Sequence, residues 1–133
     1  MQRRKVFIVE DTLELSRLYE RIFRLSGFEV ELSGNGAEAL ERLERSTELP
    51  GVIILDAVVP KVTGVEVLRR LKLDERLSSI PVIVLTNSLG SESEDLFRTL
   101  GAHMYLTKMD HEPSYIVGKV NECFGAPPET AQL

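Results

Sequence analysis

The chain has 133 residues and a net charge of -5 at pH 7, with 43% hydrophobic and 28% charged residues. This length suits one compact domain, and the acidic balance argues against a nucleic-acid surface. No apolar stretch is long enough for a secretory signal or a membrane span, and the single cysteine, Cys123, cannot form an internal disulfide. We therefore expect a cytoplasmic protein.

Five β-rich segments alternate with helical patterns along the chain. Residues 6–9, 52–55 and 82–85 are apolar at every position, which predicts strands covered on both faces, as in a parallel sheet. Residues 28–33 alternate apolar and polar side chains, which indicates a strand nearer an edge. The last strand is expected at residues 103–106.

Residues 12–26 carry the pattern of the first helix. The apolar positions recur at intervals of three and four residues, which brings them to one face. Gly27 follows as the expected terminator. The residues expected to face inward are Leu15, Leu18, Ile22 and Leu25.

A second helix is expected from Asn35 onward. Asn35 can cap it, and Glu38 follows three residues later, where it can reach back to the cap as in a capping box. A closing helix should begin near Pro113, because proline suits the first turn of a helix. The residues expected to face inward in the second helix are Ala37, Leu40 and Leu43.

The alternation of strands and helices predicts the fold class. Strand-plus-helix units joined by crossovers of a dozen or more residues are typical of an α/β fold, here a doubly wound five-stranded parallel sheet with helices on both faces. We expect this domain to occupy residues 1–124. Residues 125–133, which contain two adjacent prolines, are expected to form a flexible tail.

Polar residues follow four of the predicted strands: Glu10 and Asp11, then Asp56, Thr86 and Lys108. Asp56 alone would more often be a turn residue than a functional one. The carboxyl ends of parallel strands share one edge of the sheet, however, where ligands bind in such folds. We therefore expect these side chains to converge on one crevice.

The chemistry of this set indicates a phosphoryl site. Three carboxylates repel one another unless a cation lies between them, and Mg²⁺ prefers such oxygen ligands. Lys108 could neutralise phosphoryl oxygens, and Thr86 could donate a hydrogen bond to one. Carboxylate side chains can also act as nucleophiles that form aspartyl-phosphates.

The ordered set of strand-end residues resembles a response-regulator receiver domain, the phosphoacceptor of two-component signalling, and the match runs from about Lys5 to Phe124. This resemblance implies a flavodoxin-like strand order of 2-1-3-4-5. The residues that carry it are Val9-Glu10-Asp11, Leu55-Asp56, Pro60, Gly64, Leu85-Thr86, Gly101-Ala102, Tyr105 and Lys108.

The resemblance also implies roles at the metal and the phosphoryl group. Asp56 would be the phosphorylated aspartate and a metal ligand, and Asp11 a direct ligand of Mg²⁺. Glu10 would hold a metal-bound water, and Val58 would lend its backbone carbonyl. Lys108 would bind the phosphoryl group. No other cofactor is implied.

Signalling would follow from two further residues. Thr86 resembles the switch hydroxyl, and Tyr105 the aromatic residue that moves inward when Thr86 is pulled toward the phosphate. The phosphoryl group would come from a sensor histidine kinase or a histidine phosphotransfer protein, and a separate effector protein would receive the signal. Such a domain assists its own Mg²⁺-dependent phosphorylation and dephosphorylation without being a classical enzyme. Whether phosphorylation also drives dimerisation is left open.

Departures from the family pattern bear on access to Asp56. Family members usually carry a small residue where this chain has Asn87, and commonly a proline after a cis peptide where it has Met109. We expect a trans Lys108-Met109 bond, because a non-proline cis peptide costs about 2.5–4 kcal/mol. Val58 and Ser88 offer little acid or amide chemistry to guide water, which favours a long-lived phosphorylated state.

Two other functions are weighed against this hypothesis. One is a phosphorylation-independent adaptor with a receiver-like fold. The other is a different α/β protein, either a haloacid-dehalogenase-like phosphatase or a flavodoxin-like cofactor binder. A phosphatase of that kind would need an Asp-x-Asp pair on the first strand, which Glu10-Asp11 is not. A cofactor binder of that kind would need a glycine-rich loop after that strand.

Overall fold

The computed structural model describes residues 4–58, 61–87, 91–108 and 112–125, with the side chains of residues 91–93 also excluded. Strands and helices alternate along these residues. The strands are β1 (Lys5–Val9), β2 (Glu29–Ser33), β3 (Val52–Asp56), β4 (Val82–Thr86) and β5 (Met104–Thr107). The helices are α1 (Leu13–Leu25), α2 (Gly36–Arg45), α3 (Gly64–Leu73), α4 (Ser91–Thr99) and α5 (Pro113–Cys123).

The strands form one parallel sheet in the order β2-β1-β3-β4-β5. Val9 is level with Ser33 on β2 and with Leu55 on β3, and Thr86 on β4 is level with Thr107 on β5. The predicted fold class and strand order are therefore confirmed. This register also places the carboxyl ends of the strands along one edge, where the polar residues follow.

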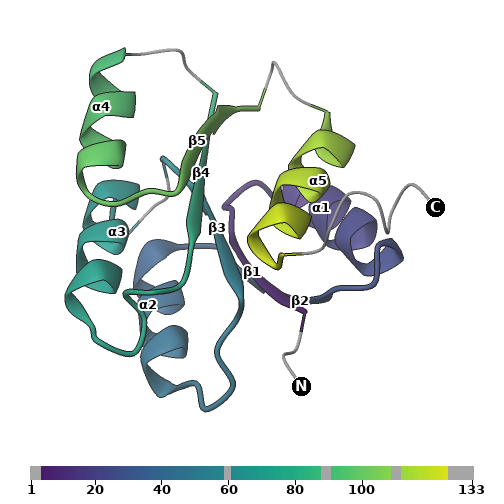
Figure 1. The fold of residues 1–133 in the computed structure, drawn as a ribbon, viewed down its shortest axis with the longest axis horizontal. Coiled ribbons are helices and arrows are strands. Elements are labelled where there is room, and N and C mark those ends of the chain that lie inside the picture. Colours follow the sequence, from purple (N-terminus) through teal and green to yellow (C-terminus); the bar gives the residue numbers. More distant parts are fainter. Residues whose placement is uncertain (1–3, 59–60, 88–90, 109–111, 126–133) are drawn as a thin grey trace.

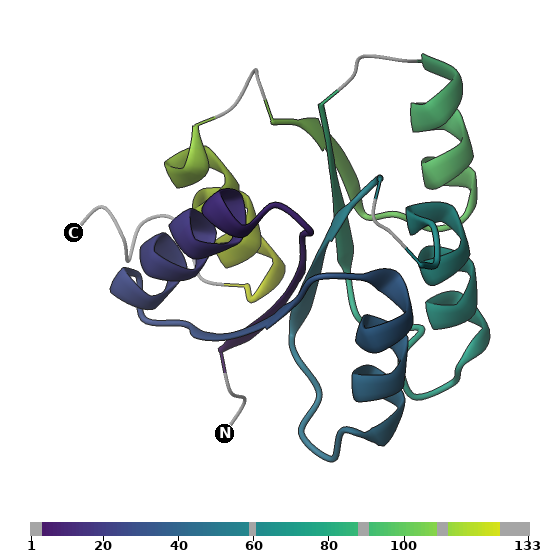
Figure 2. The same cartoon turned by 180° about the vertical axis from the view of Figure 1, so that it is seen from behind.

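Helices cover both faces of the sheet, with α1 and α5 on one side and α2, α3 and α4 on the other (Figure 1). The opposite view in Figure 2 shows the same division. Each central strand contributes side chains to both cores, since successive residues point to opposite faces. Val6 and Ile54 pack with α1 and α5, whereas Phe7 and Ile53 pack with α2 and α3. This two-sided burial explains why the central strands are apolar throughout.

The predicted inward face of α1 is confirmed only in part. Leu15 and Ile22 are half-buried and pack against the core, whereas Leu18 is 42% exposed and Leu25 is 80% exposed. The buried residues of the helix are Ser16, Tyr19 and Phe23. Both sets recur at helical spacing, but a shift of one residue turns the face by about 100°. The two aromatic rings fill the space against the sheet that was assigned to the leucines. Gly27 does end the helix, with a φ of 92° that favours glycine.

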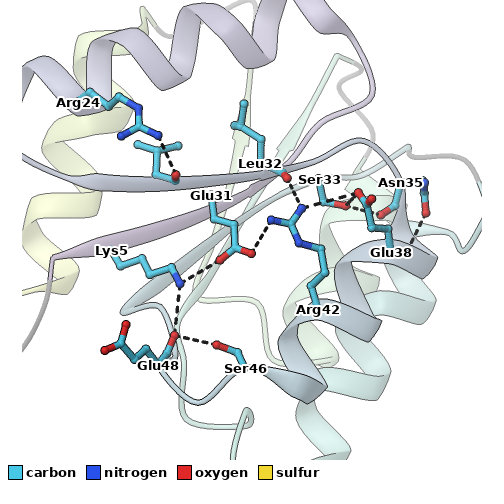
Figure 3. A network of polar contacts seen from close by, with 11 residues as sticks. Lys5, Arg24, Glu31, Leu32, Ser33, Asn35, Glu38, Arg42, Ser46 and Glu48 are labelled. Atoms are coloured by element: carbon cyan, nitrogen blue, oxygen red, sulfur yellow. Dashed lines mark hydrogen bonds and ion pairs between the residues drawn. The ribbon is translucent and has the colours of Figure 1, made fainter.

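The start of α2 is confirmed in part. Asn35 accepts a hydrogen bond from the Glu38 N–H through Oδ1 at 2.8 Å, as expected of the cap. The Glu38 carboxylate does not reach back as predicted, because it accepts a hydrogen bond from the Ser33 hydroxyl at 2.8 Å (Figure 3). Ala39 is buried and Ala37 is exposed, so the predicted inward position of Ala37 is wrong.

None of the described helices is both long and apolar enough to cross a membrane. Pro60, Ser88, Met109 and residues 126–133 lie outside the described part of the chain, and so does the Lys108-Met109 peptide bond. The expectations for these positions stay predictions.

Candidate functional site

Asp56 is the last residue of β3, and its side chain is only 8% exposed. The chain stays on the sheet beyond it, because the Ala57 N–H donates to the Leu85 carbonyl at 2.8 Å. One carboxylate oxygen, Oδ1, accepts a hydrogen bond from the Val58 N–H at 3.0 Å. Asp56 thus makes a turn contact through Oδ1, while Oδ2 lies 2.8 Å from Lys108 Nζ.

Glu10 and Asp11 follow β1, the strand that pairs with β3. The Glu10 N–H donates to the Ser33 carbonyl at 2.9 Å, which extends the ladder past the end of β1. Glu10 is buried, whereas Asp11 is exposed. One carboxylate oxygen from each of Glu10, Asp11 and Asp56 lies within 4.8 Å of the others. The predicted convergence of the three acids is therefore seen in the structure.

Lys108 reaches this acidic group from the end of β5. Its backbone N–H donates to the Thr86 carbonyl at 2.8 Å, which holds the residue beside β4. Its Nζ lies 2.7 Å from Glu10 Oε1 and 2.8 Å from Asp56 Oδ2. The Lys108 side chain is 6% exposed, so one buried ammonium is shared by two buried carboxylates.

Burial and neighbouring groups shift the pKa values of Glu10 and Lys108. Burial raises the pKa of Glu10, and the charge of Asp56 adds to this against the opposing hydrogen bond from Lys108. Burial alone would lower the pKa of Lys108, but hydrogen bonds and charges from Asp56 and Glu10 outweigh it and raise the pKa. Lys108 therefore remains an ammonium at neutral pH, held by acids that also repel each other.

The donor set fits a hard divalent cation. Three carboxylates face one ammonium, so negative charge remains in excess, and all the available ligand atoms are oxygens. Mg²⁺ favours such sets because it binds a few carboxylates and keeps part of its water shell. The residues present are therefore suited to hold this ion at the end of β1 and β3.

A surface pocket opens onto these groups, with Asp56 and Asp11 in its wall. Thr86 ends β4 beside it and is buried, whereas Asn87 is exposed at its rim. Thr12 also lines it and donates its backbone N–H to Glu10 Oε2 at 3.2 Å. Sequence reasoning missed Thr12, although its position directly after two acids and before a helix could have indicated it.

Tyr105 lies apart from the pocket, in the core between the sheet and α4. Its side chain is 8% exposed, and its ring centre is 5.8 Å from that of Phe97. Among the described residues, no group accepts or donates a hydrogen bond at the Tyr105 hydroxyl. Tyr105 is therefore packed in the core, and its ring already points inward.

Comparison with known proteins agrees with this geometry. The family model of the response regulator receiver domain matches residues 6–119. A transcriptional regulatory protein CpxR homolog from Haemophilus influenzae is 36% identical over 100 residues, which are 75% of this chain but only 40% of that protein. The chain therefore spans less than half of that relative's length.

Two further proteins resemble the chain over most of their length. The polar-differentiation response regulator DivK of Brucella anthropi is 35% identical over 113 residues, 85% of this chain and 90% of DivK. The crystal structure of the phosphorylated cyanobacterial phytochrome response regulator RcpA is 31% identical, with a TM-score of 0.79 and 90% of each chain covered. With its sheet order and its strand-end acids, the chain belongs to the response regulator receiver domain family.

Proposed function

We propose that this receiver domain is a phosphorylation-dependent switch that accepts a phosphoryl group on Asp56 from a histidine kinase or a histidine phosphotransfer protein. The observation that carries the proposal is the setting of the Asp56 carboxylate. It lines a surface pocket, within 4.8 Å of two other acids and 2.8 Å from Lys108 Nζ. The phosphorylated state of the similar RcpA structure supports the same chemistry.

The transfer step uses groups that are already in place. An Asp56 carboxylate oxygen attacks phosphorus and the bond from phosphorus to the donor nitrogen breaks, which leaves an acyl-phosphate on Asp56. Lys108 can pass from Asp56 Oδ2 to a phosphoryl oxygen, and its raised pKa keeps the ammonium charged. The Thr86 hydroxyl can donate to another oxygen. Bound Mg²⁺ would supply further positive charge against the anionic donor.

Within this proposal the residues at the ends of β1 and β3 would hold the metal. Asp11 and Asp56 would be the direct ligands, Glu10 would bind through water, and Val58 would contribute its backbone carbonyl. Val58 lines the pocket, and its backbone N–H already contacts Asp56. The same set assists loss of the phosphoryl group to water.

The switch is proposed to pass through Thr86 and Tyr105 to a separate effector protein. A phosphoryl group adds about -1.5 to -2 charges at pH 7, which draws the Thr86 hydroxyl toward Asp56. Among the described residues the Tyr105 hydroxyl has no hydrogen-bond partner, and such a buried hydroxyl costs about 1–3 kcal/mol. No hydrogen bond between these residues therefore holds the ring in its inward position. The single cysteine of the sequence is compatible with the cytoplasm, where we place this function.

Intact mass after incubation with Mg²⁺ and a small acyl-phosphate donor tests the phosphoacceptor role. The wild type should gain the mass of one phosphoryl group, and Asp56→Ala should gain none. Glu31→Gln, which changes a carboxylate far from the pocket, should react like the wild type. A wild type without added mass would reject the switch and favour the phosphorylation-independent adaptor, for which Asn87 at the pocket rim is the supporting feature.

The lifetime of the phosphorylated state is a second measurable property. Val58 places an apolar side chain at the pocket, where it offers water no hydrogen bond. We therefore expect Val58→Asn to lose its phosphoryl group faster than the wild type after the donor is removed. Equal or shorter half-lives for the wild type would contradict the expected long-lived state.

A further inference from the structure

One edge of the sheet is formed by β2, which pairs with β1 alone among the described strands. The Glu29 N–H donates to the Arg4 carbonyl at 2.8 Å, and the Ser33 carbonyl accepts from the Glu10 N–H at 2.9 Å. Alternate residues of a parallel strand direct their backbone groups to opposite neighbours. Val30 and Leu32 therefore direct their carbonyl oxygens away from β1, onto the open edge.

Two arginines from opposite faces of the sheet donate hydrogen bonds to these carbonyl oxygens (Figure 3). Arg24, in the last turn of α1, donates Nη2 to the Val30 carbonyl at 3.1 Å. Arg42, in the last turn of α2, donates Nη1 to the Leu32 carbonyl at 2.5 Å. Because α1 and α2 cover different faces, the two guanidinium groups close over the edge from both sides.

Carboxylates hold both guanidinium groups in these positions. Glu20, one turn earlier in α1, accepts from Arg24 Nε at 3.1 Å. Glu31, on β2 itself, accepts from Arg42 Nη2 at 2.5 Å, and it also pairs with Lys5 Nζ at 2.9 Å. Each edge carbonyl is thus capped by a cation that also pairs with an acid of the chain.

We propose that Arg24 and Arg42 close the β2 edge against pairing with the β2 strand of a second copy of this chain. An open edge with unpaired carbonyls is a template for strand addition. A second β2 is the fitting partner, because each copy presents the same groups and a two-fold axis satisfies both copies at once. The inference is independent of the phosphoacceptor role.

The arginines oppose this pairing by their position. A strand hydrogen-bonded to the edge lies about 4.7–4.9 Å from β2, in the space that the guanidinium groups occupy. Their hydrogen bonds also use the Val30 and Leu32 carbonyl oxygens that an added strand would need. Loss of both arginines frees this space and these oxygens, whereas Glu31 keeps its pairing with Lys5.

The test compares Arg24→Ala/Arg42→Ala with Arg69→Ala/Arg70→Ala by sedimentation equilibrium over a range of concentrations. Arg69 and Arg70 pair with Glu66 within α3, so the control removes the same charge away from the sheet edge. Alanine supports both helices. The edge variant should self-associate at least about tenfold more tightly than the wild type, because both caps are lost from each edge. The control should match the wild type.

A third variant separates edge pairing from other association. Val30 directs its N–H outward, so Val30→Pro removes an edge donor without a loss from the β1 ladder. Added to Arg24→Ala/Arg42→Ala, it should return self-association to the level of the wild type. If the double variant lacks native circular dichroism, the single variants are measured against Arg69→Ala, and each should still associate more tightly.

Equal self-association of the edge variant and its control would overturn the proposal. Association that persists unchanged after Val30→Pro would also overturn it, because the contact would then lie elsewhere. Amide hydrogen exchange gives an independent reading: protection of Val30 and Leu32 should rise with the concentration of the edge variant. Unchanged protection in the associated form would contradict edge pairing.

Discussion

Two clusters of charge on the same sheet are balanced differently. At the carboxyl edge, Lys108 is shared by Glu10 and Asp56. At the β2 edge, Glu31 is shared by Lys5 and Arg42, and Arg42 Nη1 also lies 3.8 Å from Glu38 Oε1. The first cluster has acids in excess, whereas the second has as many acids as cations, although both use the same kinds of side chain.

Burial gives these two arrangements different consequences. Burial raises the pKa of Glu10 despite the hydrogen bond from Lys108, so folding disfavours the charged form of this carboxylate. Burial also acts to raise the pKa of Glu31, but the charges of Lys5 and Arg42 outweigh it and lower the pKa. The acidic cluster therefore favours a further cation, whereas the β2 cluster is satisfied by the chain itself.

The largest difference in stability between the two clusters is expected when the lysine of each cluster is replaced. Lys108→Met should lower the free energy of unfolding by about 3–5 kcal/mol without metal, because it leaves two buried carboxylates unpaired. Lys5→Met should cost about 1 kcal/mol or less, since its pair is partly exposed. Urea unfolding of both variants at neutral pH, in the presence of a chelator, measures the contrast.

The pH dependence of Lys108→Met provides a control. A carboxyl group with a raised pKa contributes stability that is present below its unfolded value of 4.5 and is lost as pH rises through the folded value. The penalty of Lys108→Met should therefore shrink as pH falls toward 4.5. A penalty of equal size for both lysine variants would show that the two clusters do not differ as described.

Addition of Mg²⁺ should stabilise only through the acidic cluster. At a free concentration one hundred times its dissociation constant, an ion that binds only the folded chain adds about 2.7 kcal/mol. Asp11→Asn should lose most of this gain, because it removes an exposed carboxylate from the set of three. Glu31→Gln should keep it. Thermal melting with and without Mg²⁺ tests the expectation, and a response lost equally in both variants would contradict it.

The smallest effect is expected from acid titration of the β2 cluster. Because the pKa of Glu31 is lowered, its contribution is present above the unfolded value of 4.5 and is lost as pH falls through the folded value. Glu31→Gln should thus be less stable than the wild type at pH 7, by about 1 kcal/mol or less. Urea unfolding from pH 7 to pH 3 should show the two curves converge at the acid end.

A control for this titration is available in α2. Glu41 forms an exposed pair with Arg45 on the same helix. Glu41→Gln should stay closer to the wild type at neutral pH, because an exposed pair within one helix contributes little. If Glu31→Gln and Glu41→Gln behave alike across the whole range, the β2 cluster is no more than ordinary surface charge.

Much of the fold and of the acidic cluster could be predicted from local sequence. Residues 52–55 are apolar at every position, a pattern typical of a strand with two covered faces, and Asp56 follows at its carboxyl end. The same pattern at residues 6–9 places Glu10 and Asp11 at an equivalent point. Convergence of the three acids then follows from the parallel sheet alone.

Other features depended on contacts that local sequence does not encode. Leucines and aromatic residues of α1 share the same spacing, and only packing against β1 and β3 selected Tyr19 and Phe23 for burial. The same dependence holds for Arg24 and Arg42, whose sequence positions fit any exposed helix turn. Their role at β2 required the relative placement of two helices on opposite faces of the sheet.

The sequence by itself determined the α/β class, the parallel order of strands and helices, and the acids at the strand ends, because hydrophobic periodicity and chain direction are local properties. Only the tertiary structure decided that Lys108 bridges Glu10 and Asp56 and that two arginines close the edge beside Glu31. Both arrangements join residues distant in sequence, and their energies depend on burial and distance.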